Sequence, residues 1–315
     1  MYYKLFEAVI SVVLIILIGF LAAKFGWCNK KSKEVLSEFA LNFTVPALLF
    51  VSFSSTQINT IFNIRFIIGI ILVFYITFLL SYIISNFFLK ISDTAKILYS
   101  MLTSWSNFTY IGLVLFASLF NDKGINAVSV IILITSIICL PTVIILLEIS
   151  NHDKNESRSK IILKSIKRAC CQPIIFASFI GIAFSCFNIH IPYAIHSSLH
   201  ILGRSTAGIV LFVVGVSLSG RGFRITKTIL SAVIIKLIIQ PLIALLIVYI
   251  LGLRGYLAII LILSFGISSG ALPILFSHKY NSFVTESANI LLLTNILFMV
   301  TILFFYYFLL QYLHF

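Results

Sequence analysis

Two short polar runs interrupt otherwise apolar stretches, and their residues are the ones best suited to chemistry. One run is Ser104-Trp105-Ser106-Asn107-Phe108-Thr109, and the other is Gly266-Ile267-Ser268-Ser269-Gly270, which is soon followed by Pro273. Such residues break a helix and leave backbone amides unpaired, which hydrocarbon does not tolerate unless protein, water or solute pairs with them. Free amides at the start of a half-helix also attract anions. The chemistry expected here is the binding of a polar or anionic solute.

Other polar residues inside apolar stretches leave two interpretations open. Small residues also let helices pack closely, and Gly266 to Gly270 is itself a G-x-x-x-G pattern. Lys236 either lines a solute path as a counter-charge or extends to the cytoplasmic face. Asn42 and Thr44, just before Pro46, either face the path or satisfy backbone groups freed by the proline.

The composition predicts an all-α integral membrane protein. Of 315 residues, 61% are apolar and 10% are charged, whereas soluble domains average about 45–50% and about 25%. The net charge of +13 comes from Lys and Arg residues in short runs between apolar stretches. That pattern is typical of cytoplasmic loops rather than of nucleic-acid binding. The lipid bilayer is therefore an expected partner and nucleic acid is not.

Ten apolar runs are long enough to cross a bilayer, whose core of about 30 Å needs roughly 20 residues per helix. The expected spans are 6–23, 36–54, 64–88, 95–119, 125–147, 168–187, 197–218, 228–251, 255–277 and 284–312.

The distribution of positive charge orients these spans. Sixteen of the 22 Lys and Arg residues fall in the odd-numbered loops, five on the opposite side, and Lys236 lies inside a span. The odd loops are therefore predicted to be cytoplasmic, with both termini outside the cell membrane.

The longest polar stretch, from Glu148 to Lys167, divides the ten spans into five and five. Residues 1–150 and 165–315 then form two repeats joined by a cytoplasmic linker at 148–167, all within one membrane domain. An odd number of spans per repeat inverts one repeat relative to the other, which is a transporter signature. Transporters of this design bind solute where a helix breaks in each half, so the fourth and ninth spans are expected to be broken and to cross.

No metal, cofactor or enzymatic activity is expected. The five Cys and six His residues show no C-x-x-C or H-E-x-x-H spacing. Gly266 to Gly270 fits the G-x-S-x-G nucleophile elbow with Ser268 at its centre, but that elbow needs a strand, a turn and a His and acid partner. No Asp or Glu lies deep in any span. An intramembrane enzyme using Ser268 therefore remains only a distant alternative.

Segments along nearly the whole chain resemble the auxin efflux carrier family, which includes plant auxin exporters and bacterial malate or malonate carriers. The matching segments are Gly19-Phe20-Leu21-Ala22-Ala23-Lys24-Phe25-Gly26, Thr44-Val45-Pro46-Ala47-Leu48-Leu49-Phe50, Gln172-Pro173-Ile174-Ile175-Phe176-Ala177, Leu211-Phe212-Val213-Val214-Gly215, Lys236 with Pro241, and Pro273-Ile274-Leu275-Phe276.

The resemblance implies a fold, a solute class and a site. It implies that the fourth and ninth helices cross at a midplane site, that the solute is an organic anion, and that movement is elevator-like. It assigns solute binding to Asn107, followed by Ile111 and Gly112, and places Val45 and Thr135 at the border of the pocket. Plant members have prolines at both crossings, where this chain has Ser106 and Ser268, and many have a long cytoplasmic loop that is absent here. These departures favour a compact microbial carrier.

The sequence therefore predicts a ten-helix carrier of a small organic anion. Assembly as a homodimer is left open. The expected site residues are Asn42, Val45, Ser106, Asn107, Thr135, Lys236, Ser268, Ser269 and Gly270. The alternative within transport is a sodium-coupled bile-acid-type symporter, which shares ten helices and crossed broken helices.

Overall fold

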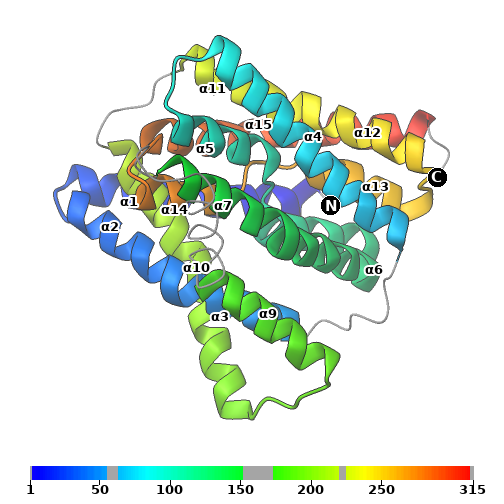
Figure 1. Ribbon diagram of the computed structural model, residues 1–315, viewed down its shortest axis with the longest axis horizontal. Coiled ribbons are helices and arrows are strands. Elements are labelled where there is room, and N and C mark those ends of the chain that lie inside the picture. The colour runs from blue at the N-terminus through cyan, green and yellow to red at the C-terminus, as the bar shows by residue number, and fades with distance from the viewer. Residues whose placement is uncertain (1, 55–62, 152–172, 220–224, 313–315) are drawn as a thin grey trace.

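The computed structural model describes residues 2–54, 63–151, 173–219 and 225–312, and every element named in these ranges is helical (Figure 1). The α-helices are α1 (Tyr2–Lys24), α2 (Lys30–Phe39), α3 (Val45–Ser54), α4 (Ile64–Phe88), α5 (Asp93–Ser104), α6 (Leu113–Ile134), α7 (Leu140–Ser150), α9 (Pro173–Cys186), α10 (Tyr193–Ser219), α11 (Lys227–Ile234), α12 (Gln240–Leu251), α13 (Gly255–Gly266), α14 (Leu272–Lys279) and α15 (Val284–Tyr312). Four π-helical turns join some of them: η1 (Ala40–Thr44), η3 (Phe108–Gly112), η4 (Thr135–Cys139) and η5 (Ile235–Ile239).

Five helical stretches in the described ranges are long and apolar enough to cross a membrane: Lys31–Ser54, Ile64–Phe88, Lys123–Ser150, Lys227–Leu251 and Val284–Tyr307. They correspond to the second, third, fifth, eighth and tenth expected spans, and α4 has the predicted bounds of the third. The integral membrane class is thus confirmed, while the count of ten and the inverted repeat stay predictions. Most of the expected linker at 148–167 lies outside the described residues.

The α4 helix has the distribution of apolar and polar side chains expected of a helix in lipid. Leu72, Ile76 and Leu79 are exposed along one face, whereas Thr77 and Ser81 are buried on the other. The Thr77 hydroxyl donates to the Val73 carbonyl at 2.7 Å, so the buried polar group is satisfied within its own helix. The helix therefore directs apolar side chains toward lipid and hydroxyls toward the protein, which suits a bilayer.

Three of the π-helical turns end two residues before a proline: η1 before Pro46, η4 before Pro141 and η5 before Pro241. Proline lacks an N–H, and its ring clashes with the carbonyl four residues earlier. A π-helical turn widens the helix by one residue at such a point. The prolines thus explain where these helices are deformed, and the deformations carry Thr135 and Lys236.

The helices pack as two groups. The first helix group comprises α1, α2–η1–α3, α9 and α10, in which α1 packs on α10 and α3 packs on both α9 and α10. The second helix group comprises α4 to α7 and α11 to α15, in which α4 packs on α5, and α12 packs on α13 and α4. In Figure 1, α3, α9 and α10 extend together away from the second helix group.

Glycines allow the close approach of α1 and α10 in the first helix group. A Cβ atom added at Gly215 would lie 2.0 Å from the Ile16 carbonyl oxygen, and one at Gly19 would lie 2.2 Å from the Phe212 carbonyl oxygen. Both obstacles are backbone atoms, which a rotamer change cannot move. The two helices can therefore pack this closely only because glycine stands at these positions.

We expect Gly215→Ala to lower the midpoint of thermal unfolding in detergent, because overpacking costs about 1–3 kcal/mol. Gly208→Ala on the same helix is the control, since a Cβ there has no neighbour within 4 Å. Equal midpoints for the two variants would contradict the packing described for α1 and α10.

Candidate functional site

Two helices of the second group stop in the middle of the protein. The α5 helix ends at Ser104, and Trp105 then takes an extended conformation with φ −89° and ψ 115°. The α13 helix ends at Gly266, and Ile267 is likewise extended with φ −75° and ψ 168°. Helical structure resumes only at Phe108 and at Leu272. The two polar runs of the sequence thus form the two breaks.

The breaks satisfy each other's backbone. Ser106 and Ser269 form an isolated antiparallel bridge. The Asn107 N–H donates to the Ser268 carbonyl at 2.9 Å, and the Gly270 N–H donates to the Trp105 carbonyl at 2.8 Å. These amides are buried, so leaving them unpaired would be costly in the interior of a membrane protein. The structure therefore brings together two interruptions that lie far apart in the sequence.

Glycine is required at position 270 by the approach of the first break. A Cβ atom there would lie 2.6 Å from Trp105 Cδ1 and 3.1 Å from the Ser106 carbonyl oxygen. Trp105 is held in turn against Phe74, with ring centroids 5.8 Å apart in an edge-on arrangement. The small residue thus permits the backbone pairing.

The α15 helix supports the second break with a polar face that the sequence analysis missed. The Ser269 N–H donates to Thr294 Oγ1 at 3.2 Å, and the Ser268 hydroxyl donates to Asn295 Oδ1 at 2.9 Å. Thr294 and Asn295 are fully buried. Two adjacent polar residues in an apolar run were the signal that could have identified them.

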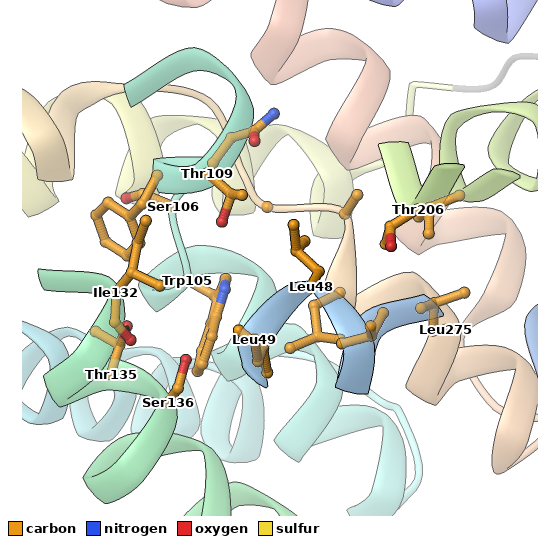
Figure 2. Close-up of a pocket in the computed structure, with 17 residues that line it drawn as sticks. Leu48, Leu49, Trp105, Ser106, Thr109, Ile132, Thr135, Ser136, Thr206 and Leu275 are labelled. Atoms are coloured by element: carbon orange, nitrogen blue, oxygen red, sulfur yellow. Dashed lines mark hydrogen bonds between the residues drawn. The ribbon is translucent and has the colours of Figure 1, made fainter. Parts of the chain in front are cut away.

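A cavity of about 70 Å³ lies where the breaks face the first helix group. In Figure 2 the labelled side chains of Ser106, Thr135 and Ser136 lie on one side, Thr206 lies on the other, and Leu48 and Leu49 come from α3. The lining residues are Val45, Leu48, Leu49, Trp105, Ser106, Asn107, Phe108, Thr109, Ile132, Thr135, Ser136, Thr206, Val210, Gly270, Ala271, Leu272 and Leu275.

Two buried polar atoms of this cavity lining have no hydrogen-bond partner in the described part of the chain. They are Asn107 Nδ2 and Thr206 Oγ1, on residues that are 3% and 2% exposed. Buried polar groups are nearly always hydrogen-bonded, so each exception calls for an explanation such as a ligand or water. The two atoms come from different helix groups, and a bound polar solute would satisfy both.

The predicted site residues do not all line the cavity. Val45, Ser106, Asn107, Thr135 and Gly270 line the cavity. Ser268 and Ser269 do not line it, since their hydroxyls are engaged with Asn295 and with the Leu102 carbonyl. They hold the breaks together from behind the cavity wall.

Asn42 is not part of this cavity. It is exposed and lines a separate cavity of about 370 Å³. The other residues of that lining are Glu34, Ser37, Glu38, Leu41, Pro173, His278, Lys279 and Asn281. The η1 turn places Asn42 toward the α2 end of the helix, one turn away from Val45.

Lys236 follows neither of the two interpretations that the sequence left open. It is fully buried, so it does not reach the membrane surface, and it does not line the cavity. Its ammonium donates to Ser106 Oγ and to Gln240 Oε1. Lys236 therefore reaches the cavity only through Ser106.

The arrangement suits a polar or anionic ligand. Gly270, Ala271 and Leu272 border the cavity at the start of α14, where the helix dipole favours negative charge. Among the described residues, no three His, Cys, Asp or Glu side chains form a group that could hold a metal ion. The buried side-chain atoms left unpaired at this cavity by the described residues are the Asn107 amide nitrogen and the Thr206 hydroxyl oxygen.

Comparison with known proteins identifies relatives across most of the chain. A family model described as membrane transport protein matches residues 4–306. An uncharacterized transporter of Escherichia coli strain K12, YfdV, is 21% identical over 241 residues, which cover 76% of each chain. The lysosomal cholesterol signaling protein of Mus musculus is 26% identical over 254 residues, which cover 76% of this chain and 29% of that protein.

A plant protein matches a shorter part. Auxin efflux carrier component 8 of Arabidopsis thaliana is 25% identical over 129 residues, which cover 39% of this chain and 35% of the plant protein. The family model, by contrast, spans nearly the whole chain. The resemblance found in the sequence is thus confirmed, and the chain belongs to the membrane transport protein family of the auxin efflux carriers.

Proposed function

We propose that this protein is a secondary transporter that carries a small organic anion, such as a dicarboxylate or an auxin-like acid, across the cell membrane. The observation that carries the proposal is Asn107 Nδ2, a buried donor at the cavity with no partner in the described ranges. An amide N–H donates well to a carboxylate, and a hydrogen bond to a charged group contributes about 1.5–3 kcal/mol. The solute carboxylate would accept from Asn107 beside the first turn of α14.

The relatives support transport as the function class. Two of them carry transport in their descriptions, as a transporter and as an auxin efflux carrier component. Since catalysis would need a base beside Ser268, its bond to the Asn295 amide also supports a carrier over an intramembrane enzyme.

An elevator-like, alternating-access movement is the mechanism that best fits the two helix groups. The first helix group contributes Val45, Leu48, Leu49, Thr206 and Val210 to the cavity, and the second contributes both breaks. If the second helix group slides along the first, the solute held at the breaks moves with it. The proposal includes ten spans in two inverted repeats, for which the antiparallel pairing of the breaks is supporting geometry.

We propose that the second cavity is part of the solute's route between the cavity at the breaks and one membrane surface. Both cavities are lined by α14 and by α2–η1–α3: Leu275 and Val45 face the first, while His278 and Leu41 face the second, one turn away. Leu41, Val45 and Leu275 are buried between them. The lysines of the loops at this end, including Lys30, Lys31, Lys33 and Lys279, support a cytoplasmic position for it, with both termini outside.

We expect Asn107→Ala to reduce the uptake of a labelled organic anion into proteoliposomes about 10- to 100-fold, because a hydrogen bond to a charged group is lost. Thr206→Val should reduce it less, since a neutral hydroxyl contributes about 1 kcal/mol. The solutes to test are dicarboxylates and aryl acids, and exposed Asn86→Ala is the control. Uptake by Asn107→Ala equal to that of the wild type would refute the site.

We expect Asn42→Trp to slow uptake without weakening solute binding to purified protein, because the added ring would narrow the second cavity. The matched control is Phe43→Trp, on a side chain that is 56% exposed and absent from that cavity's lining. Binding is measured by isothermal titration and transport by initial rates. If both tryptophan variants carry solute at the wild-type rate, the route lies elsewhere.

The alternative is a sodium-coupled bile-acid-type symporter, and ion replacement separates the two. We expect uptake to continue when external sodium is replaced by choline, because the cavity described here presents N–H and O–H donors and no carboxylate. A sodium site is usually built from several oxygen ligands. Uptake that stops in choline would favour the symporter.

A further inference from the structure

A lysine lies buried behind the cavity, and its hydrogen-bond partners among the described residues are neutral. Lys236 has no exposed surface, and its two hydrogen-bond partners are Ser106 and Gln240. Neither partner is a carboxylate. A buried charge is costly when it is not paired with an opposite one, so its presence calls for a role beyond packing.

Contacts made by its neighbours fix the direction of the Lys236 side chain. Lys236 lies in η5, just before Gln240 and Pro241. The Gln240 Nε2 donates to the Ser104 carbonyl at 2.9 Å, which turns its Oε1 toward the lysine. Ser104 is the last residue of α5, and the carbonyl end of a helix attracts a cation. Lys236 is thus held against the C-terminal end of α5.

This contact determines which way the Ser106 hydroxyl points. An ammonium group can only donate, so Ser106 Oγ is the acceptor in its contact with Lys236. The hydroxyl keeps its own proton, which must be donated to another group. Because Ser106 lines the cavity, that proton is available to a solute there. The ammonium group of Lys236 is then separated from the same solute by the Ser106 hydroxyl group.

We propose that Lys236 is a positioning residue that sets the specificity of the cavity for anions, acting through Ser106. It orients the Ser106 hydroxyl as a donor, and in its protonated form it places a positive charge behind that hydroxyl with no carboxylate partner among the described residues. The cavity would then favour a carboxylate over a neutral solute of the same shape. This inference rests on the proposed function and deepens it, since it names the group that selects the charge of the solute.

The test compares a dicarboxylic acid with its diamide, which has nearly the same shape and no charge. Binding of each to purified protein is measured by isothermal titration for wild type, Lys236→Met and Lys236→Arg. We expect Lys236→Met to lower the preference for the acid about tenfold or more, because one nearby positive charge is removed. Lys236→Arg should keep much of that preference. Exposed Lys123→Met removes one charge elsewhere and should leave the preference unchanged.

A purely structural role for Lys236 gives a different result. In that case Lys236→Met would weaken the binding of acid and diamide equally, and the preference between them would not move. That outcome would overturn the inference even if the variant still folds and still binds. A preference lost equally in Lys236→Met and Lys123→Met would overturn it too, because net charge alone would then be responsible.

A double-mutant cycle tests the path through Ser106 without any solute. Thermal unfolding is measured for Lys236→Met, Ser106→Ala and the double variant. We expect the two substitutions to be non-additive, as for residues in one hydrogen-bond network, and additive effects would refute the contact. If the wild type binds no acid at all, the proposed function fails, while this cycle still decides whether Lys236 acts on Ser106.

Discussion

The two backbone hydrogen bonds between the breaks are the constraint on which the rest of the structure depends. The Asn107 N–H pairs with the Ser268 carbonyl, and the Gly270 N–H pairs with the Trp105 carbonyl. Without them, four backbone groups would be buried and unpaired, at a cost of several kcal/mol each in hydrocarbon. The pairing also brings the first turns of η3 and α14 to one cavity. Gly270 and the polar face of α15 are consequences of the same requirement.

Prolines provide the second level of organisation. Pro46, Pro141 and Pro241 each follow a π-helical turn; Val45 directly follows the first turn, and the other two turns contain Thr135 and Lys236. A widened turn shifts the register of the side chains that come after it. Proline is unfavourable inside a helix. At these three positions it nevertheless determines which side chains of three long helices are directed inward. The deformation of the helix and the placement of the site have a common cause.

The sequence predicted those features that depend on residue type alone. Polar runs inside apolar stretches identified both breaks, and charge and length identified the membrane class and the bounds of α4. It could not predict Thr206 or Gln240, because the direction of a side chain on a long helix depends on how neighbouring helices are rotated. For the same reason it could not predict that Asn42 and Val45, one helical turn apart, line different cavities. Neither interpretation of Lys236 included its contact with Ser106, because Ser106 is 130 residues distant in sequence.

The face that the first helix group presents to the cavity is almost entirely aliphatic. Val45, Leu48, Leu49 and Val210 line that side, and Thr206 is its polar exception. The hydrogen bonds that hold the breaks lie wholly within the second helix group. Dispersion contacts between aliphatic side chains are weak individually and have little directionality. At this cavity the two helix groups therefore meet mainly through aliphatic side chains, and the hydrogen bonds between the breaks do not depend on contacts with the first helix group.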